Sequence, residues 1–307
     1  MASMQSSRTA QLLADLEGAL TWMRSLGVEI DPERHAAYRK MLEKWDDFVA
    51  GRGKLGMREL HPIMATFAYE APALIQIHRS FGACPPAELA GLAAQLSAAT
   101  RGPIRIIDPA AAAGLPARDA LFHARAAAYV QQVAHEGRVP LAADGSATFA
   151  HGRHQFYIAA ERLRPDAGIQ DSIRTACARL VTALDGRQRA KSRGLVVLDA
   201  SALVRWSAPG PALPTQARAS MDGAADQLLA EFIDAQMNAL QDALRGMDRR
   251  IIGVLTLLSS AAVADDDQAV VHVGRWVLVW RDHINFTDYE VLERLRDLMR
   301  AAQPEPR

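Results

Sequence analysis

The stretch GRHQFYIAAERLRP, residues 152–165, decides how the middle of this 307-residue chain is expected to fold. Its apolar centre at 156–160 has the length and composition of a buried β-strand, and the charged residues after it are typical of a turn. The preceding segment VPLAADGSATF, residues 139–149, has the composition of a second short strand. We therefore expect 139–149 and 154–160 to form a hairpin with its turn at 151–153.

Helices are expected on both sides of this hairpin. Residues 117–136 and 168–184 carry apolar side chains at helical spacing. The continuous apolar run GLVVLDA at 194–200 is typical of a strand covered on both faces in the middle of a sheet. The order helix, hairpin, helix, strand predicts an α/β fold of the α+β kind, with a mixed sheet flanked by helices.

The whole chain is predicted to divide into two parts. Residues 1–100 form a helical N-terminal region, and residues 101–307 form the α/β domain, completed by a C-terminal helix and further strands. The other elements expected are helices at 35–49, 61–81, 87–99, 216–247 and 288–302, a short strand at 104–107, a strand at 251–258, and two strand pieces within 270–280 on either side of Gly274.

Composition excludes several classes of protein. The 35 basic and 35 acidic residues balance, which argues against a protein that coats nucleic acid over its whole surface. No apolar run is long enough for a membrane helix, and the N-terminus lacks the apolar core of a signal peptide, so we expect a cytoplasmic protein without a membrane partner. The two cysteines are too few for a disulfide framework or a thiolate zinc site.

The element order and wording at 117–201 resemble a known family. AAAYVQQVAHEGRVPL (126–141), GRHQFYIAAERLRP, IRTACARL (173–180) and RGLVVLDAS (193–201) are similar to consecutive segments of the PD-(D/E)XK, or restriction-endonuclease-like, nucleases. The resemblance implies their αβββαβ core, with one of the three strands short or hidden here. It also implies a bacterial restriction or defence system as the setting.

The residues that carry the family's chemistry are replaced. Members hold Mg²⁺ between two carboxylates on adjacent strand ends, and a lysine assists the attacking water. The matching positions here are Thr148, Ala159 and Glu161, which supply neither the two acids nor the lysine. We therefore expect no catalytic residue, no metal site and no cofactor. The alternative is an active Mg²⁺-dependent nuclease that uses relocated acids at Asp144, Glu161 and Asp199.

Basic residues concentrate in the same region. Residues 101–200 hold 14 Arg or Lys against 9 Asp or Glu. Such a run is often a solvated surface, but guanidinium groups also suit phosphate recognition. The segment GRQRAKSRG, residues 186–194, is the strongest candidate for a phosphate contact. The nucleic-acid-binding residues predicted are Arg153, Arg162, Arg164, Arg174, Arg187, Arg189, Lys191 and Arg193.

Three functions follow as hypotheses. The first is a nuclease-derived scaffold that has lost catalysis and binds nucleic acid or a partner protein. The second is the active nuclease with relocated acids. The third places the function in the helical N-terminal region, as a homo-oligomerisation or effector-docking module. His151 and His154 could share a metal with a third ligand, but polar turn residues are the more common interpretation of such a pair.

Overall fold

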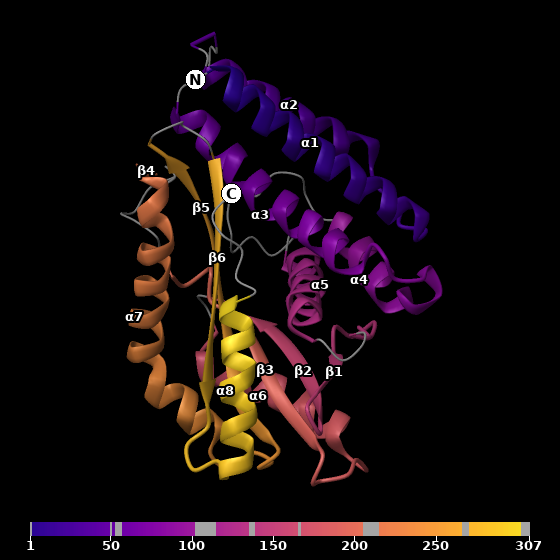
Figure 1. The fold of residues 1–307 in the computed structure, drawn as a ribbon, viewed down its shortest axis with the longest axis vertical. Helices are drawn as coiled ribbons and strands as arrows, with labels where there is room; N and C mark the ends of the chain where they lie inside the picture. The colour runs from indigo at the N-terminus through magenta and orange to yellow at the C-terminus, as the bar shows by residue number, and fades with distance from the viewer. Residues whose placement is uncertain are drawn as a thin grey trace.

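In the computed structural model the chain folds as helices packed on both faces of one curled mixed sheet, so the predicted α+β class and helical N-terminal region are confirmed (Figure 1). None of the described helices is both long and apolar enough to cross a membrane. The residues that the structure describes are 2–49, 51–52, 57–101, 115–134, 139–164, 167–204, 215–265 and 270–301.

The N-terminal region is built from helices that pack in layers. Helices α1 and α2 lie on α3, and α3 in turn packs against α5 and the strands β5 and β6. Asp31 starts α2 by accepting the backbone N–H of Glu33 at 2.8 Å, with Pro32 in the first helical position, as its sequence predicts. The bounds are α1 Ala2–Ser25, α2 Pro32–Val49, α3 Met57–Phe81, a 3₁₀ turn η1 at Pro86–Glu88, α4 Ala90–Thr100 and α5 Leu115–Val133.

The sheet runs in the order β1-β2-β3-β5-β6, and short β4 pairs with the far end of β5. Strands β2, β3 and β5 are parallel neighbours, whereas β1 and β6 are antiparallel to β2 and β5. The bounds are β1 Ala147–His151, β2 His154–Arg162, α6 Ile169–Leu184, β3 Ser192–Asp199, β4 Thr215–Gln216, α7 Arg218–Leu244, β5 Ile251–Ala264, β6 Val270–Trp280 and α8 Phe286–Ala301.

The predicted hairpin, the helix after it and the parallel strand are therefore confirmed, but the first strand is shorter than expected. It begins at Ala147 instead of 139, because Asp144 accepts the backbone N–H of Ser146 at 2.9 Å and Gly145 has a φ of 81°, which together make a tight turn. Leu141 contributes one isolated bridge to Ala147. The expected strand at 104–107 and residues 135–138 lie outside the described residues.

Two predictions at the C-terminal end were wrong in extent. Strand β5 continues past Leu258 to Ala264, and β6 is not interrupted at Gly274. Gly274 pairs with Ser259 within an unbroken ladder. A Cβ atom at Gly274 would lie 3.0 Å from the Arg125 guanidinium, so the glycine serves close packing and does not break the strand.

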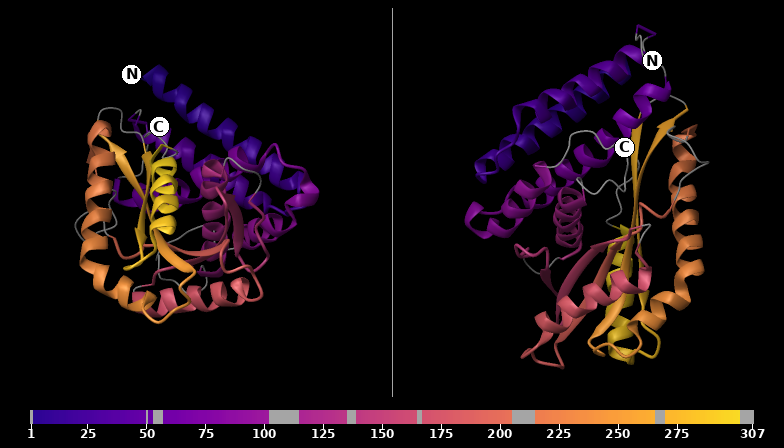
Figure 2. Two further views of the ribbon diagram at one scale, coloured as in Figure 1. Left: turned by 60° about the horizontal axis from the view of Figure 1, so that its bottom comes forward. Right: turned by 180° about the vertical axis from the view of Figure 1, so that it is seen from behind.

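The apolar core has two parts, one on each face of the sheet. Helices α3, α5 and α8 cover one face, and α6 and α7 cover the other (Figure 2). The first cluster joins Leu16 and Met23 of α1 to Leu195 of β3 and Leu292 of α8. Residues from the helical N-terminal region and from the sheet therefore share one continuous core.

Parallel neighbours define two functional edges of the sheet. Strands β2 and β3 end side by side at Arg162 and Asp199, beside α3 and α5, and β5 continues past them to Ala264. The amino ends of the three strands meet at the opposite edge, with the loops that precede them. Both edges gather polar side chains.

Candidate functional site

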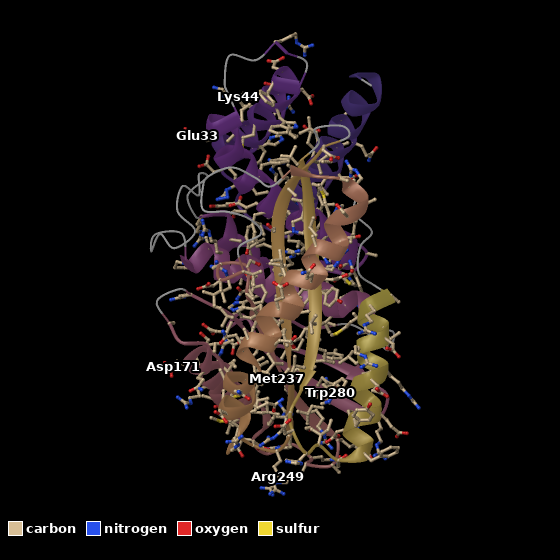
Figure 3. All side chains as sticks on the ribbon, turned by 90° about the vertical axis from the view of Figure 1, so that its left-hand side faces the viewer. Glu33, Lys44, Asp171, Met237, Arg249 and Trp280 are labelled. Carbon is tan, nitrogen blue, oxygen red and sulfur yellow. The ribbon has the colours of Figure 1, made fainter. Side chains whose placement is uncertain are left out.

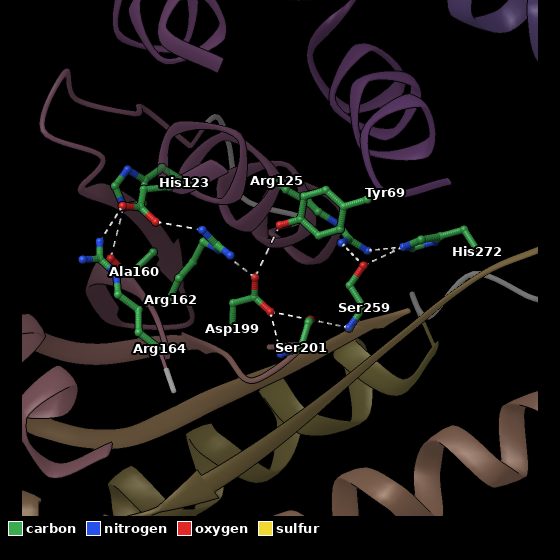
Figure 4. A network of polar contacts seen from close by, with 11 residues as sticks. Tyr69, His123, Arg125, Ala160, Arg162, Arg164, Asp199, Ser201, Ser259 and His272 are labelled. Atoms are coloured by element: carbon green, nitrogen blue, oxygen red, sulfur yellow. Dashed lines mark hydrogen bonds and ion pairs between the residues drawn. The ribbon is translucent and has the colours of Figure 1, made fainter. Parts of the chain in front are cut away.

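A chain of ion pairs lies at the carboxyl ends of β2 and β3 (Figure 4). Arg162, the last residue of β2, donates from Nε to Asp199 Oδ2 at 3.3 Å and from a terminal nitrogen to Asp119 Oδ1 at 3.1 Å. Arg164 donates to the other oxygen of Asp119 at 2.9 Å. Asp199 is 2% exposed and Arg162 7% exposed, so these charges neutralise each other inside the protein.

The chain continues from Asp199 to the strands β5 and β6. Asp199 Oδ1 accepts the hydroxyl and the backbone N–H of Ser201, and Ser201 Oγ accepts the backbone N–H of Ser259 at 2.7 Å. Arg125 of α5 donates to Ser259 Oγ at 2.7 Å and to His272 Nε2 at 3.1 Å. Because a guanidinium can only donate, His272 Nε2 holds a lone pair and the ring is neutral.

Burial sets the electrostatics of this network. It lowers the pKa of His272 well below the ordinary value, and the nearby Arg125 lowers it further. Burial also raises the pKa of Tyr69 to about 12, with Asp199 adding to the shift. Tyr69 of α3 donates its hydroxyl to Asp199 Oδ2 at 3.4 Å. The network therefore ties helices α3 and α5 to the sheet.

Sequence reasoning singled out only Arg162, Arg164 and Asp199 from this network. It missed Tyr69, Asp119, Arg125, Ser259 and His272, whose partners lie up to 147 residues away in the chain. No local spacing signals such contacts. Two signals could place these residues at the same edge: the helical periodicity of the apolar residues in α5, and the parallel order of β3 and β5.

The relocated acids of the nuclease alternative are each engaged by polar groups of the protein. Asp144 accepts from Ser146 in the turn before β1, and Glu161 pairs with Arg179 of α6 at 2.7 Å. Asp199 is in the network with Arg162. Within the described ranges, no group of three or more His, Cys, Asp or Glu side chains is arranged to hold a metal ion.

The other positions that match the family's motif contribute no acidic group. Thr148 pairs with Tyr157 in the β1–β2 ladder, and Ala159 is buried in the core beneath α6. Burial raises the pKa of Glu161, and Arg179 opposes that shift. The two turn histidines differ: His154 is buried with Asp288 Oδ1 at 4.0 Å from its Nε2, whereas His151 lies at the end of β1.

The predicted basic residues fall into separate environments. Arg162 and Arg164 belong to the network at the carboxyl edge, and Arg174 pairs on the surface of α6 with Asp171 at 3.3 Å. Arg193 is buried at the amino edge, where its Nε donates to Asp288 Oδ1 at 2.6 Å. The remaining four, Arg153, Arg187, Arg189 and Lys191, are exposed in loops of the amino edge.

Those loops form a surface that we call the basic end. It comprises the four loops 152–153, 185–191, 245–250 and 281–285, which precede or follow the sheet strands at their amino edge. They hold eight Arg or Lys and three Asp. Figure 3 shows Arg249 projecting from this end, opposite Lys44 in the helical region.

Five exposed cations of the basic end form no ion pair with a described residue. Asp248 is occupied by Arg250, which donates to both of its oxygens, and Asp288 is occupied by Arg193. Within the described part of the chain no ion pair involves Arg153, Arg187, Arg189, Lys191 or Arg249. Uncompensated, exposed cations at one edge are suited to a polyanion.

Comparison with known proteins gives no family for the chain: no family model matches it, and no curated protein matches it.

Proposed function

We propose that the protein binds nucleic acid through its basic end and does not cleave it. The observation that carries this proposal is the group of five exposed, unpaired cations on loops that converge at the amino edge of the sheet. Each phosphate contact releases condensed counterions, so such a group favours a polyanionic ligand.

The absence of cleavage is proposed from the chemistry of the motif positions. A divalent ion needs hard anionic oxygens, and neither the Thr148 hydroxyl nor the Ala159 methyl group is one. Glu161 takes the position that is lysine in the restriction-endonuclease-like family, and its carboxylate is engaged by Arg179. The resemblance over 117–201 thus supports a nuclease-derived scaffold within a bacterial defence system, as part of the same proposal.

The test is binding measured by fluorescence anisotropy at several salt concentrations. Labelled single-stranded DNA, RNA and duplex DNA of equal length serve as probes. We expect binding that weakens steeply with salt, and Arg189→Ala with Lys191→Ala should weaken it about tenfold or more at low salt, with a smaller salt slope.

A matched control removes the same charge far from the basic end. Lys40→Ala with Lys44→Ala changes two cations of α2 that lack an ion pair in the described chain, and it should leave binding within about twofold. Equal loss in both double variants, or no binding at low salt by the unmodified protein, would contradict the proposal.

The nuclease alternative is tested on the same samples. Linear, circular and single-stranded DNA and RNA are incubated with Mg²⁺ or Mn²⁺. We expect intact substrates. Cleavage that EDTA abolishes, and that Asp144→Ala or Glu161→Ala removes, would establish the alternative with relocated acids.

A further inference from the structure

The β1–β2 hairpin has one buried face and one half-open face. Along β1 up to Ala150 and along β2 from His154 to Ile158, burial alternates with the two-residue period of a sheet. The buried face carries Ala147, Phe149, Phe156 and Ile158, and the half-open face carries Thr148, Ala150, Gln155 and Tyr157.

Helix α6 covers the neighbouring strand but leaves Tyr157 partly accessible. Tyr157 pairs with Thr148 on one side and with Gly194 of β3 on the other. A Cβ atom at Gly194 would lie 3.3 Å from Leu180 and 3.4 Å from Leu184, so α6 sits directly over β3. Tyr157 at the margin of this helix is half-buried, and it packs against the core cluster on the α6 face of the sheet.

The Tyr157 ring adjoins the basic end. The Arg187 guanidinium carbon lies 5.8 Å from the centre of the Tyr157 ring, and Arg187 is exposed. Arg153 lies in the turn between the two strands, and the backbone of Lys191 accepts the N–H of Gln155 at 2.8 Å. A sheet face with one aromatic ring is therefore bordered by three cations without acidic partners.

We propose that Tyr157 is a stacking platform for an unpaired base, so that the ligand of the basic end is single-stranded nucleic acid. This inference rests on the proposed function and names its substrate class. Inside a duplex both faces of a base are stacked on its neighbours, so an aromatic ring on a protein surface reaches the face of an internal base only in a single strand. Arg187 lies over the ring in the free protein, so its exposed side chain moves outward to cover the second face of such a base, and Arg153 and Lys191 contact the flanking phosphates.

The test compares two substitutions at Tyr157. Tyr157→Phe keeps the ring, and Tyr157→Leu keeps an apolar side chain against the core but removes the stacking surface. Anisotropy is measured with labelled 20-nucleotide oligothymidine and with a 20-base-pair duplex, and thermal unfolding checks that both variants are folded. We expect Tyr157→Leu to weaken binding of the single strand by about 5- to 150-fold, the range for one lost base–aromatic stack. Tyr157→Phe should bind within about twofold of the unmodified protein.

The outcomes separate this inference from the proposed function. Duplex binding should be weaker than single-strand binding, and it should not change in Tyr157→Leu. If Tyr157→Leu binds the single strand normally while Arg189→Ala with Lys191→Ala loses it, the platform is refuted and the basic end stands. If the unmodified protein binds neither probe, both fail together. A Tyr157→Leu variant that unfolds is replaced by Tyr157→Met, which also fills the apolar contact without a ring, and unchanged single-strand binding by that variant refutes the platform.

Discussion

Arg193 donates its Nε–H to Oδ1 of Asp288 at 2.6 Å and so joins the start of β3 to the start of α8. Both side chains are buried, with 10% and 5% of their surfaces exposed. Arg193 lies in the most basic segment of the chain, yet its partner places it in the interior. Its role is structural, whatever its neighbours in the sequence bind.

Replacing Arg193 should therefore destabilise the fold. Arg193→Ala leaves Asp288 buried and unpaired, which costs about 3–5 kcal/mol in the free energy of unfolding. Urea denaturation followed by circular dichroism measures it. The comparison is Arg189→Ala, exposed in the loop before β3, which should change stability by about 0.5 kcal/mol or less. Similar effects of the two variants would contradict the buried pair.

The two carboxylates that hold Arg162 should differ in importance. Asp199 also accepts from Tyr69 and Ser201 and is almost fully buried, whereas Asp119 is a quarter exposed. Asp199→Ala should cost about 3–5 kcal/mol, because the buried Arg162 loses the more deeply buried of its two compensating charges. Asp119→Ala should cost clearly less, since water reaches that site. Equal losses in the free energy of unfolding, measured by urea denaturation, would show that burial does not decide how much each carboxylate contributes.

His272 should make stability depend on pH. Burial and Arg125 hold its folded pKa below the unfolded value of about 6.5. The unfolded chain therefore binds a proton that the folded chain excludes, and stability present above pH 6.5 is lost as the pH falls below it. His272→Gln, which keeps an acceptor for Arg125, should reduce the loss in urea midpoint between pH 7.5 and 5.5. An unchanged slope in this variant would assign the pH dependence to other histidines.

Two glycines in helices should respond in opposite directions to alanine. A Cβ atom at Gly91 of α4 would collide with the carbonyl oxygen of Leu141, so Gly91→Ala must displace backbone and should cost about 1–3 kcal/mol. Gly223 of α7 has open space around the same position, and Gly223→Ala should add about 0.5–1 kcal/mol by helix propensity. Thermal unfolding of both variants decides. A stabilising Gly91→Ala would contradict the close contact of α4 with the segment before β1.

The sequence predicted which helices and strands form better than it predicted the residues at which they begin and end. Local periodicity was enough for α6, and the apolar run at 194–200 was enough for β3, because each signal lies within one element. The first strand was predicted too long, since the alternation at 139–146 resembles a strand. The turn that Asp144 forms becomes visible only in the structure. Gly274 was read as a break because its close neighbour Arg125 comes from a distant helix.

The site was harder to predict, because a sequence shows charges without their partners. Arg162 and Arg187 look equivalent in a basic run, but Arg162 meets Asp119 from 43 residues away, and Arg187 meets only an aromatic ring. Arg245, Arg249, Arg250 and Arg281 were not predicted to join the basic end. The parallel pairing of β3 with β5 and the antiparallel pairing of β5 with β6 bring their loops to the same edge as 185–191.

The continuous core between α1 and the sheet has a practical consequence for dissecting this protein. Leu16 and Met23 of α1 share one core with α3, and α3 packs against β5 and β6. The helices of the first hundred residues therefore shield one face of the sheet from water. A fragment that starts after residue 100 would lack these helices and would expose to water the apolar surface on which they pack. Work on either half is therefore better done with point substitutions in the intact chain than with truncated fragments.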